Sequence, residues 1–157
     1  AKTRGIPVKD YSTTLILGVH KRTSHGHLLA SYWVGDGAVA AYQKETRVEV
    51  LGKVDSGEFA GQTRFLDRSL VNSAEETMKR VRVALVRELT SLVLMTDGVS
   101  DPKFETDRNL GDVSRWDAFW REIEPLLADD APDERLLEWL DFWSPGNHDD
   151  RTIAVLW

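Results

Sequence analysis

The sequence of 157 residues contains no cysteine, which excludes disulfide bonds and any metal site built on thiolates. It also lacks a run of eighteen or more apolar residues and any signal-peptide pattern. We therefore expect a cytoplasmic protein that does not bind membranes. Basic residues are the minority, with 20 Lys and Arg against 26 Asp and Glu. The resulting net charge of −6 argues against nucleic acid as a partner.

Apolar residues, by contrast, are present in sufficient number to build one folded core. The hydrophobic fraction is 41%, and six tryptophans are included. A chain of this length and composition predicts a single domain spanning residues 1–157. The chain begins with Ala1 rather than with an initiator methionine. We therefore expect either a processed protein or a piece cut from a longer one.

Segments rich in β-branched and apolar residues, separated by turn residues, predict the strands of the fold. These segments are 12–20, 28–34, 39–43, 47–51, 80–88, 91–96 and 152–157. The segment 91–96 is almost continuously apolar, which predicts a strand buried on both faces. Three glycines between 52 and 63 indicate a loop.

Helical patterns are concentrated late in the chain. A capping-box spacing from Ser73 to Glu76 predicts a short helix or turn over 73–78, and Ser114 with Asp117 suggests a similar start for a helix over 114–127. A second helix follows Pro132 and keeps an apolar face as far as Trp143. We interpret the tryptophan-rich stripe of these helices as core. Short turns between strands and grouped helices predict an antiparallel α+β layered fold.

Acidic residues lie at the ends of two predicted strands. Asp97 and Gly98 follow the strand 91–96, and Asp149 and Asp150 precede the last strand. If these strands are neighbours, Asp97 and Asp149 can converge on one hard cation. Gly98 would let the chain turn at once, including through positive φ. The alternative is an ordinary turn dipeptide in which Asp97 bonds its own backbone.

Two further acids extend this pattern. Asp101 would place a second carboxylate within the same tight turn as Asp97, and the two would repel each other without a cation. Asp36, between Gly35 and Gly37, is either a third acid at a strand end or part of a hairpin turn. These groups offer oxygen ligands without a cluster of histidines, which favours Mg²⁺ or Mn²⁺. Two such ions would hold a phosphoryl group for in-line displacement.

Several segments together resemble one known family. The segment 92–101 resembles the Asp-Gly-x-x-Asp motif of the metal-dependent protein Ser/Thr phosphatases of type 2C, and 149–156 resembles the closing motif and final strand of that family. The other matching segments are 12–15 (a strand that opens the second half of the fold), 33–37 (a Gly-Asp-Ser segment, here with Gly37) and 56–66 (a segment of a bacterial subgroup).

The resemblance implies an antiparallel β-sandwich with helices on both outer faces. It implies hydrolysis of phosphoserine and phosphothreonine on proteins by a metal-bound hydroxide, with two Mg or Mn ions in the complete domain. Asp97 and Asp149 match ligands of one metal, Asp36 with Asp97 matches a possible third metal site, and Asp101 acts indirectly. Gly98 and Gly35 are expected at structural turns. The implied partners are a phosphoprotein substrate and, as a further candidate, a cognate kinase.

The chain also departs from the family pattern. The phosphate-binding Arg, the acidic pair and the Asp-Gly-His-Gly segment of the N-terminal portion are not found in this sequence. We therefore expect the C-terminal part of a phosphatase domain, with an incomplete sandwich, weak metal binding and little or no turnover. A missing sheet edge would expose apolar surface and favour self-association. The alternatives are a non-catalytic phosphatase-like module that binds a phosphoprotein or partner, and an unrelated α+β interaction domain.

Overall fold

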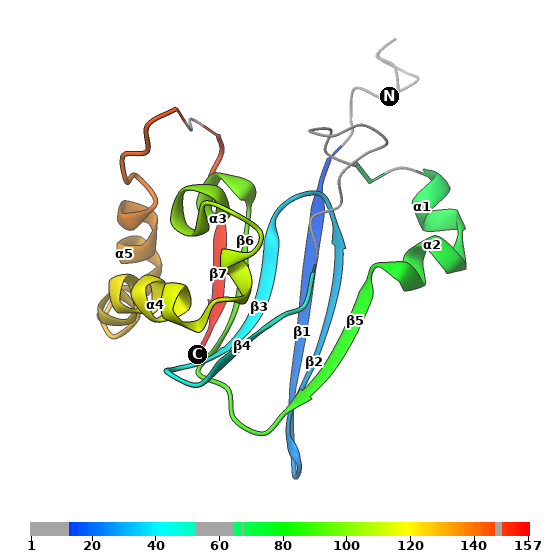
Figure 1. Cartoon of the computed structure of the whole chain (residues 1–157), viewed down its shortest axis with the longest axis horizontal. Helices are drawn as coiled ribbons and strands as arrows, with labels where there is room; N and C mark the ends of the chain where they lie inside the picture. The colour runs from blue at the N-terminus through cyan, green and yellow to red at the C-terminus, as the bar shows by residue number, and fades with distance from the viewer. Residues whose placement is uncertain (1–12, 53–64, 67, 147–148) are drawn as a thin grey trace.

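Two antiparallel sheets lie face to face in the computed structural model, which describes residues 13–52, 65–66, 68–146 and 149–157 (Figure 1). The first sheet has the order β1-β2-β5 and the second the order β4-β3-β6-β7. The strands are β1 (Leu15–Thr23), β2 (Gly26–Val34), β3 (Ala38–Gln43), β4 (Arg47–Val50), β5 (Val81–Val86), β6 (Ser91–Met95) and β7 (Ile153–Leu156). The predicted α+β sandwich is confirmed, and every predicted strand is present.

Helices occupy two places in the fold. α3 (Asp97–Phe104), α4 (Val113–Leu127) and α5 (Pro132–Trp139) cover the outer side of the second sheet, whereas α1 (Arg68–Asn72) and α2 (Ala74–Lys79) lie near one end of β5 (Figure 1). A 3₁₀ helix, η3 (Asn109–Gly111), precedes α4. The sequence analysis did not predict α1, α3 or η3. No helix in the described part of the chain is long and apolar enough to cross a membrane.

The central strands β3 and β6 carry apolar side chains on both faces. Val39, Ala41 and Leu92 point toward the first sheet and pack with its inner residues, which include Leu29 and Val86. The alternate side chains of the same strands, such as Ala40 and Val93, pack against the helices. The prediction that the strand 91–96 is buried on both faces is therefore confirmed. Packing on both faces holds β6 in place, and with it the start of the segment that follows.

The tryptophan-rich stripe of α4 forms the core between the helices and the second sheet. Trp116 is fully buried, and its indole N–H donates to the carbonyl oxygen of Leu110 at 2.8 Å. Its ring lies against several aromatic side chains, with centroid distances from 4.7 to 5.9 Å. The interpretation of this stripe as core is confirmed.

Two helix boundaries differ from the prediction. α4 begins at Val113, and its cap is Asp112, whose carboxylate accepts the N–H of Ser114 at 2.9 Å. Ser114 is therefore not the cap. α5 ends at Trp139 and does not continue to Trp143, whose side chain is 82% exposed. Directly beyond the helix end, the guanidinium of Arg151 donates to the carbonyl oxygens of Leu140 and Phe142.

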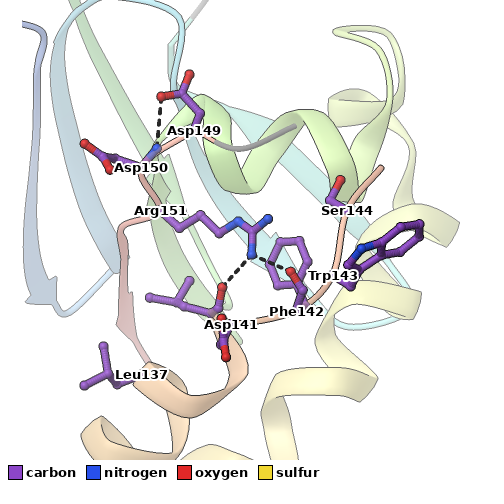
Figure 2. A pocket seen from close by; sticks show the side chains of 9 residues that line it. Leu137, Asp141, Phe142, Trp143, Ser144, Asp149, Asp150 and Arg151 are labelled. Atoms are coloured by element: carbon purple, nitrogen blue, oxygen red, sulfur yellow. Dashed lines mark hydrogen bonds between the residues drawn. The ribbon is translucent and has the colours of Figure 1, made fainter. Parts of the chain in front are cut away.

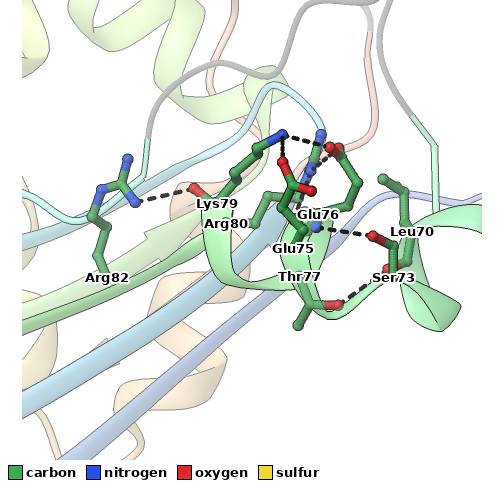
Figure 3. A network of polar contacts seen from close by, with 8 residues as sticks. All are labelled: Leu70, Ser73, Glu75, Glu76, Thr77, Lys79, Arg80 and Arg82. Atoms are coloured by element: carbon green, nitrogen blue, oxygen red, sulfur yellow. Dashed lines mark hydrogen bonds and ion pairs between the residues drawn. The ribbon is translucent and has the colours of Figure 1, made fainter.

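The short helix α2 confirms the capping prediction at Ser73. Its hydroxyl accepts the N–H of Glu76 at 3.2 Å (Figure 3). Arg80, which follows the helix and is only 6% exposed, donates to the carbonyl and carboxylate of Glu76 at 2.9 and 3.1 Å. These bonds satisfy a buried charge. They also fix the position at which the chain enters β5.

The outer face of the first sheet is apolar and exposed. By the strand register, Leu17 and Val19 of β1 share this face with Leu28 of β2 and with Val83 and Leu85 of β5. Their exposed fractions range from 39% to 66%. The exposed apolar surface thus lies on a sheet face rather than at the predicted sheet edge. Within the described residues, helices cover the outer face of the second sheet only, whereas the family resemblance implied both.

A hydrogen bond from the buried Tyr42 joins β3 to α4 and makes stability depend on pH. The hydroxyl of the buried Tyr42 donates to Asp117 at 2.5 Å, and the same carboxylate oxygen accepts the N–H of Glu45 at 2.9 Å. Burial, followed by the bond to Asp117, raises the pKa of Tyr42 above its ordinary value. The bond from Tyr42, followed by that from Glu45, lowers the pKa of Asp117 below 3.8.

We predict that Asp117→Ala lowers the free energy of unfolding by about 1–3 kcal/mol near neutral pH, because it leaves the Tyr42 hydroxyl without its acceptor. The lowered pKa of Asp117 stabilises the fold above the unfolded pKa, and this contribution is lost as pH falls through the folded value. The deficit of the variant should therefore shrink in acid. Urea denaturation from neutral pH to below pH 3.8 measures this. Tyr42→Phe, which removes the donor, should lower the free energy of unfolding by less. If Asp117→Ala lowered it equally at all pH values, the pH dependence would not come from Asp117.

Candidate metal site

Three acidic residues converge because β6 lies between β3 and β7. Ala38 of β3 and Ile153 of β7 both pair with Met95 at the end of β6. Since both pairs are antiparallel, the end of β6 lies beside the beginnings of its two neighbours. Asp97 follows β6, Asp36 precedes β3 and Asp149 precedes β7. The condition that the two acidic strands be neighbours is met.

The predicted tight turn at Asp97 and Gly98 is wrong, because both residues belong to the first turn of α3. Gly98 does not have positive φ; in the described part of the chain the glycines that do are Gly26, Gly35 and Gly146. A Cβ at Gly98 would lie 2.4 Å from the carbonyl oxygen of Asp150 and 3.1 Å from that of Asp149. Glycine is therefore required for close approach of two backbone segments.

Gly35 keeps its predicted role at a turn. Its φ is +119°, and a Cβ there would lie 2.6 Å from the side chain of Thr14. Only glycine tolerates this conformation without strain. The position of Asp36 at the end of β2 therefore depends on Gly35.

Thr96 connects the two acidic segments and was missed by the sequence analysis. Its hydroxyl donates to the carbonyl oxygen of Asp150 at 3.1 Å and accepts the N–H of Thr152 at 2.9 Å. Its backbone N–H donates to the carbonyl oxygen of Thr152 at 3.1 Å. The signal in the sequence was a threonine, a common helix N-cap, directly before Asp97. Thr96 holds the approach to β7 against the start of α3.

The carboxylates also make local bonds. Asp97 accepts the N–H of Gly98 at 2.8 Å, and Asp149 accepts the N–H of Asp150 at 2.9 Å. In the sequence analysis, local backbone bonding by Asp97 was the alternative to a role in cation binding. These hydrogen bonds show that such local bonding occurs. It does not account for the gathering of several acids from separate strands.

The charges of these acids act on one another. Burial raises the pKa of Asp97, and the charges of Asp36 and Asp149 raise it further. Burial also raises the pKa of Asp101, followed by the charges of Asp97 and Asp36. Asp101 lies four residues after Asp97 on α3, so both occupy the same side of the helix. A bound cation would relieve this repulsion.

The residues present fit part of a metal site. Their donors are carboxylate oxygens, which suit Mg²⁺ or Mn²⁺. However, the described ranges contain no group of three or more His, Asp or Glu side chains placed to hold one ion. His148 lies outside the described residues. A cation held by these acids would need further ligands, either from elsewhere or from water.

Comparison with known proteins agrees with the fold. A family model described as protein phosphatase 2C matches residues 1–141, about nine-tenths of the chain. The matched range includes Asp36, Asp97 and Asp101, and Asp149 lies beyond it. A search of curated proteins finds none that matches this chain.

Proposed function

The chain belongs to the protein phosphatase 2C family, and on this premise we propose that it takes part in metal-dependent hydrolysis of phosphoserine and phosphothreonine on proteins. The family as a whole points to phosphatase chemistry and is generally metal-dependent. The observation that carries the proposal is the convergence of Asp36, Asp97 and Asp149 at one end of the second sheet. The proposed partners are a phosphoprotein and the kinase that phosphorylates it.

Each acid has a proposed role. Asp97 and Asp149 would hold one cation, Asp36 with Asp97 would hold a further one, and Asp101 would act through water or by supporting α3. Mg²⁺ or Mn²⁺ bound here would polarise a phosphate ester and make water more acidic. Thr96 and Gly98 are positioning residues, because they keep the Asp149 segment against α3.

We propose that this chain corresponds to the C-terminal part of a phosphatase 2C catalytic domain and supplies one side of its site. The proposal is supported by the lack, in the described residues, of a group of three ligands. The same observation favours a second candidate function, a non-catalytic module that uses the phosphatase fold to bind a phosphoprotein or another partner.

The test combines calorimetric titration of Mn²⁺ into the purified chain with hydrolysis of p-nitrophenyl phosphate. We expect weak Mn²⁺ binding that falls at least about tenfold in Asp97→Asn, since removing even a supporting group typically costs that much. We expect little or no hydrolysis. Asp130→Asn removes the same charge from the loop before α5 and serves as the control.

Each outcome decides a different part of the proposal. Identical Mn²⁺ binding by the wild-type chain and Asp97→Asn would mean that Asp97 has no role in metal binding and would overturn the proposed site. Robust hydrolysis by the 157-residue chain would overturn the assignment of a partial site. Metal binding without hydrolysis, together with affinity for a phosphopeptide that is indifferent to metal, would favour the binding module.

A further inference from the structure

A cavity of about 510 Å³ opens directly beside the acidic site (Figure 2). It lies between the segment that follows α5 and the approach to β7. We call it the Arg151 pocket, and its main lining residues are Leu137, Asp141, Trp143, Asp149, Asp150 and Arg151. Its volume is within the range of roughly 300–1,000 Å³ that is usual for ligand pockets. Because Asp149 belongs to both the acidic site and the pocket, a substrate phosphate at the site would place neighbouring residues beside the pocket.

The charges around the Arg151 pocket favour a cation. Three carboxylates, those of Asp141, Asp149 and Asp150, line it together with the single guanidinium of Arg151. That guanidinium is used by the protein itself, as Figure 2 shows. One of its nitrogens donates to the carbonyl oxygens of Leu140, at 2.8 Å, and of Phe142. The guanidinium also lies 4.0 Å from the centre of the Phe142 ring.

The pocket also offers apolar surface that the fold does not use. Trp143 is 82% exposed and Leu137 is 71% exposed, and both line the cavity. The face of an exposed indole ring binds cations. Among basic side chains it binds arginine best, because the planar guanidinium stacks on the ring. The aliphatic stem of a basic side chain can cover apolar surface while its charged end meets carboxylates.

We propose that the Arg151 pocket binds an arginine or lysine side chain of the phosphoprotein substrate, close in sequence to the phosphorylated residue. Trp143 and Leu137 contact the side-chain stem, and Asp141 and Asp150 receive the charged end. Arginine is preferred over lysine, because it combines stacking with paired hydrogen bonds to a carboxylate. The inference rests on the proposed function, since it assigns the substrate class of the same site.

The experiment measures binding rather than turnover. Fluorescein-labelled phosphothreonine nonapeptides, with Arg, Lys, Gln or Glu placed in turn at each position from three before to three after the phosphothreonine, are titrated with the chain in Mn²⁺ and followed by anisotropy. We expect arginine to bind about tenfold more tightly than glutamine at one or two positions, with lysine between them. Glutamate should bind most weakly.

Variants of exposed side chains connect this preference to the pocket. Trp143→Ala and Asp141→Asn should each reduce the preference for arginine severalfold and leave Mn²⁺ binding unchanged. Asp130→Asn, which removes one charge outside the pocket, should leave the preference intact. Equal affinity for all peptides, or equal loss in Asp141→Asn and Asp130→Asn, would overturn the proposal.

The same peptides without phosphate distinguish a failure of the pocket assignment from a failure of the proposed phosphatase function. If the arginine preference persists with these peptides while Mn²⁺ does not bind, the pocket is correct and the proposed phosphatase function is wrong. If Mn²⁺ and phosphopeptides bind but no basic residue is preferred at any position, the pocket assignment is wrong and the proposed function stands.

Discussion

Replacing Gly98 by alanine should abolish most of the Mn²⁺ binding of this chain, although the same change stabilises an ordinary helix. Alanine inside a helix is normally favoured over glycine by roughly 0.5–1 kcal/mol. Here the added Cβ would lie 2.4 Å from the carbonyl oxygen of Asp150, which is far inside van der Waals contact. Either α3 or the segment that carries Asp149 must move, so the two proposed ligands separate.

We expect Gly98→Ala to weaken Mn²⁺ binding at least about tenfold. We also expect it to lower the free energy of unfolding by roughly 1–3 kcal/mol, as overpacking does elsewhere. Calorimetric titration measures the first effect and urea denaturation the second. Gly111→Ala is the matched control, because a Cβ at Gly111 meets no atom within 4 Å and its φ is not positive. Wild-type metal affinity in Gly98→Ala would show that the approach of these segments is irrelevant to the site.

Neutralising Asp97 should have opposite effects on stability with and without metal. Burial and the charges of Asp36 and Asp149 raise the pKa of Asp97, which means that the folded chain resists its ionised form. In a chelator, Asp97→Asn should therefore stabilise the fold, by less than about 1 kcal/mol after solvent screening. At an Mn²⁺ concentration 100 times the dissociation constant, the wild-type chain gains about 2.7 kcal/mol, and the variant should lose most of that gain.

Thermal unfolding in EDTA and in Mn²⁺ gives both comparisons from one pair of proteins. Asp130→Asn changes the net charge by the same amount. It should appreciably change neither the stability in EDTA nor the stabilisation by Mn²⁺. A lower stability of Asp97→Asn in EDTA would mean that favourable contacts, and not repulsion, dominate around this carboxylate. An undiminished Mn²⁺ effect would place the ion away from Asp97.

Much of the fold could be predicted from local patterns. β-branched segments between turn residues indicated all the strands, and the apolar run at 91–96 indicated its double burial. Local patterns alone left the neighbours of β6 undecided, so the convergence of Asp97 with Asp149 could only be stated as a condition. The resemblance to phosphatases of type 2C implied a β-sandwich and matched Asp97 and Asp149 to one metal, and the family model that matches residues 1–141 agrees with the resemblance.

α3 escaped prediction because its sequence argues against a helix. Gly98 and Pro102 are both poor helix formers in its eight residues, and its apolar residues follow no clear stripe. Tertiary contacts override that weak propensity. Gly98 packs against the backbone of Asp150, and Thr96 bonds the chain on both sides of it. The segment before β7 therefore stabilises α3, and the local sequence of α3 does not encode these contacts.

The start of α4 was misread for a related reason. Asp112 and Ser114 are both acceptable cap residues, and the spacing from Ser114 to Asp117 favoured the wrong one. Asp117 is occupied instead by Tyr42 and Glu45, which are more than seventy positions away in the sequence. The capping pattern at Ser114 was therefore misleading, because its acidic residue bonds to distant partners instead.

The apolar side chains exposed on the outer face of the first sheet should favour association of this chain in solution. Apolar association weakens on cooling and strengthens in sulfate or phosphate, which are excluded from protein surfaces. The solubility of the chain should therefore be highest in the cold and should fall steeply with ammonium sulfate. Leu17, Val19 and Val83 are at least half exposed, so replacing all three by serine should reduce retention on a phenyl matrix, and the exposed Leu137 and Trp143 should account for part of the retention that remains.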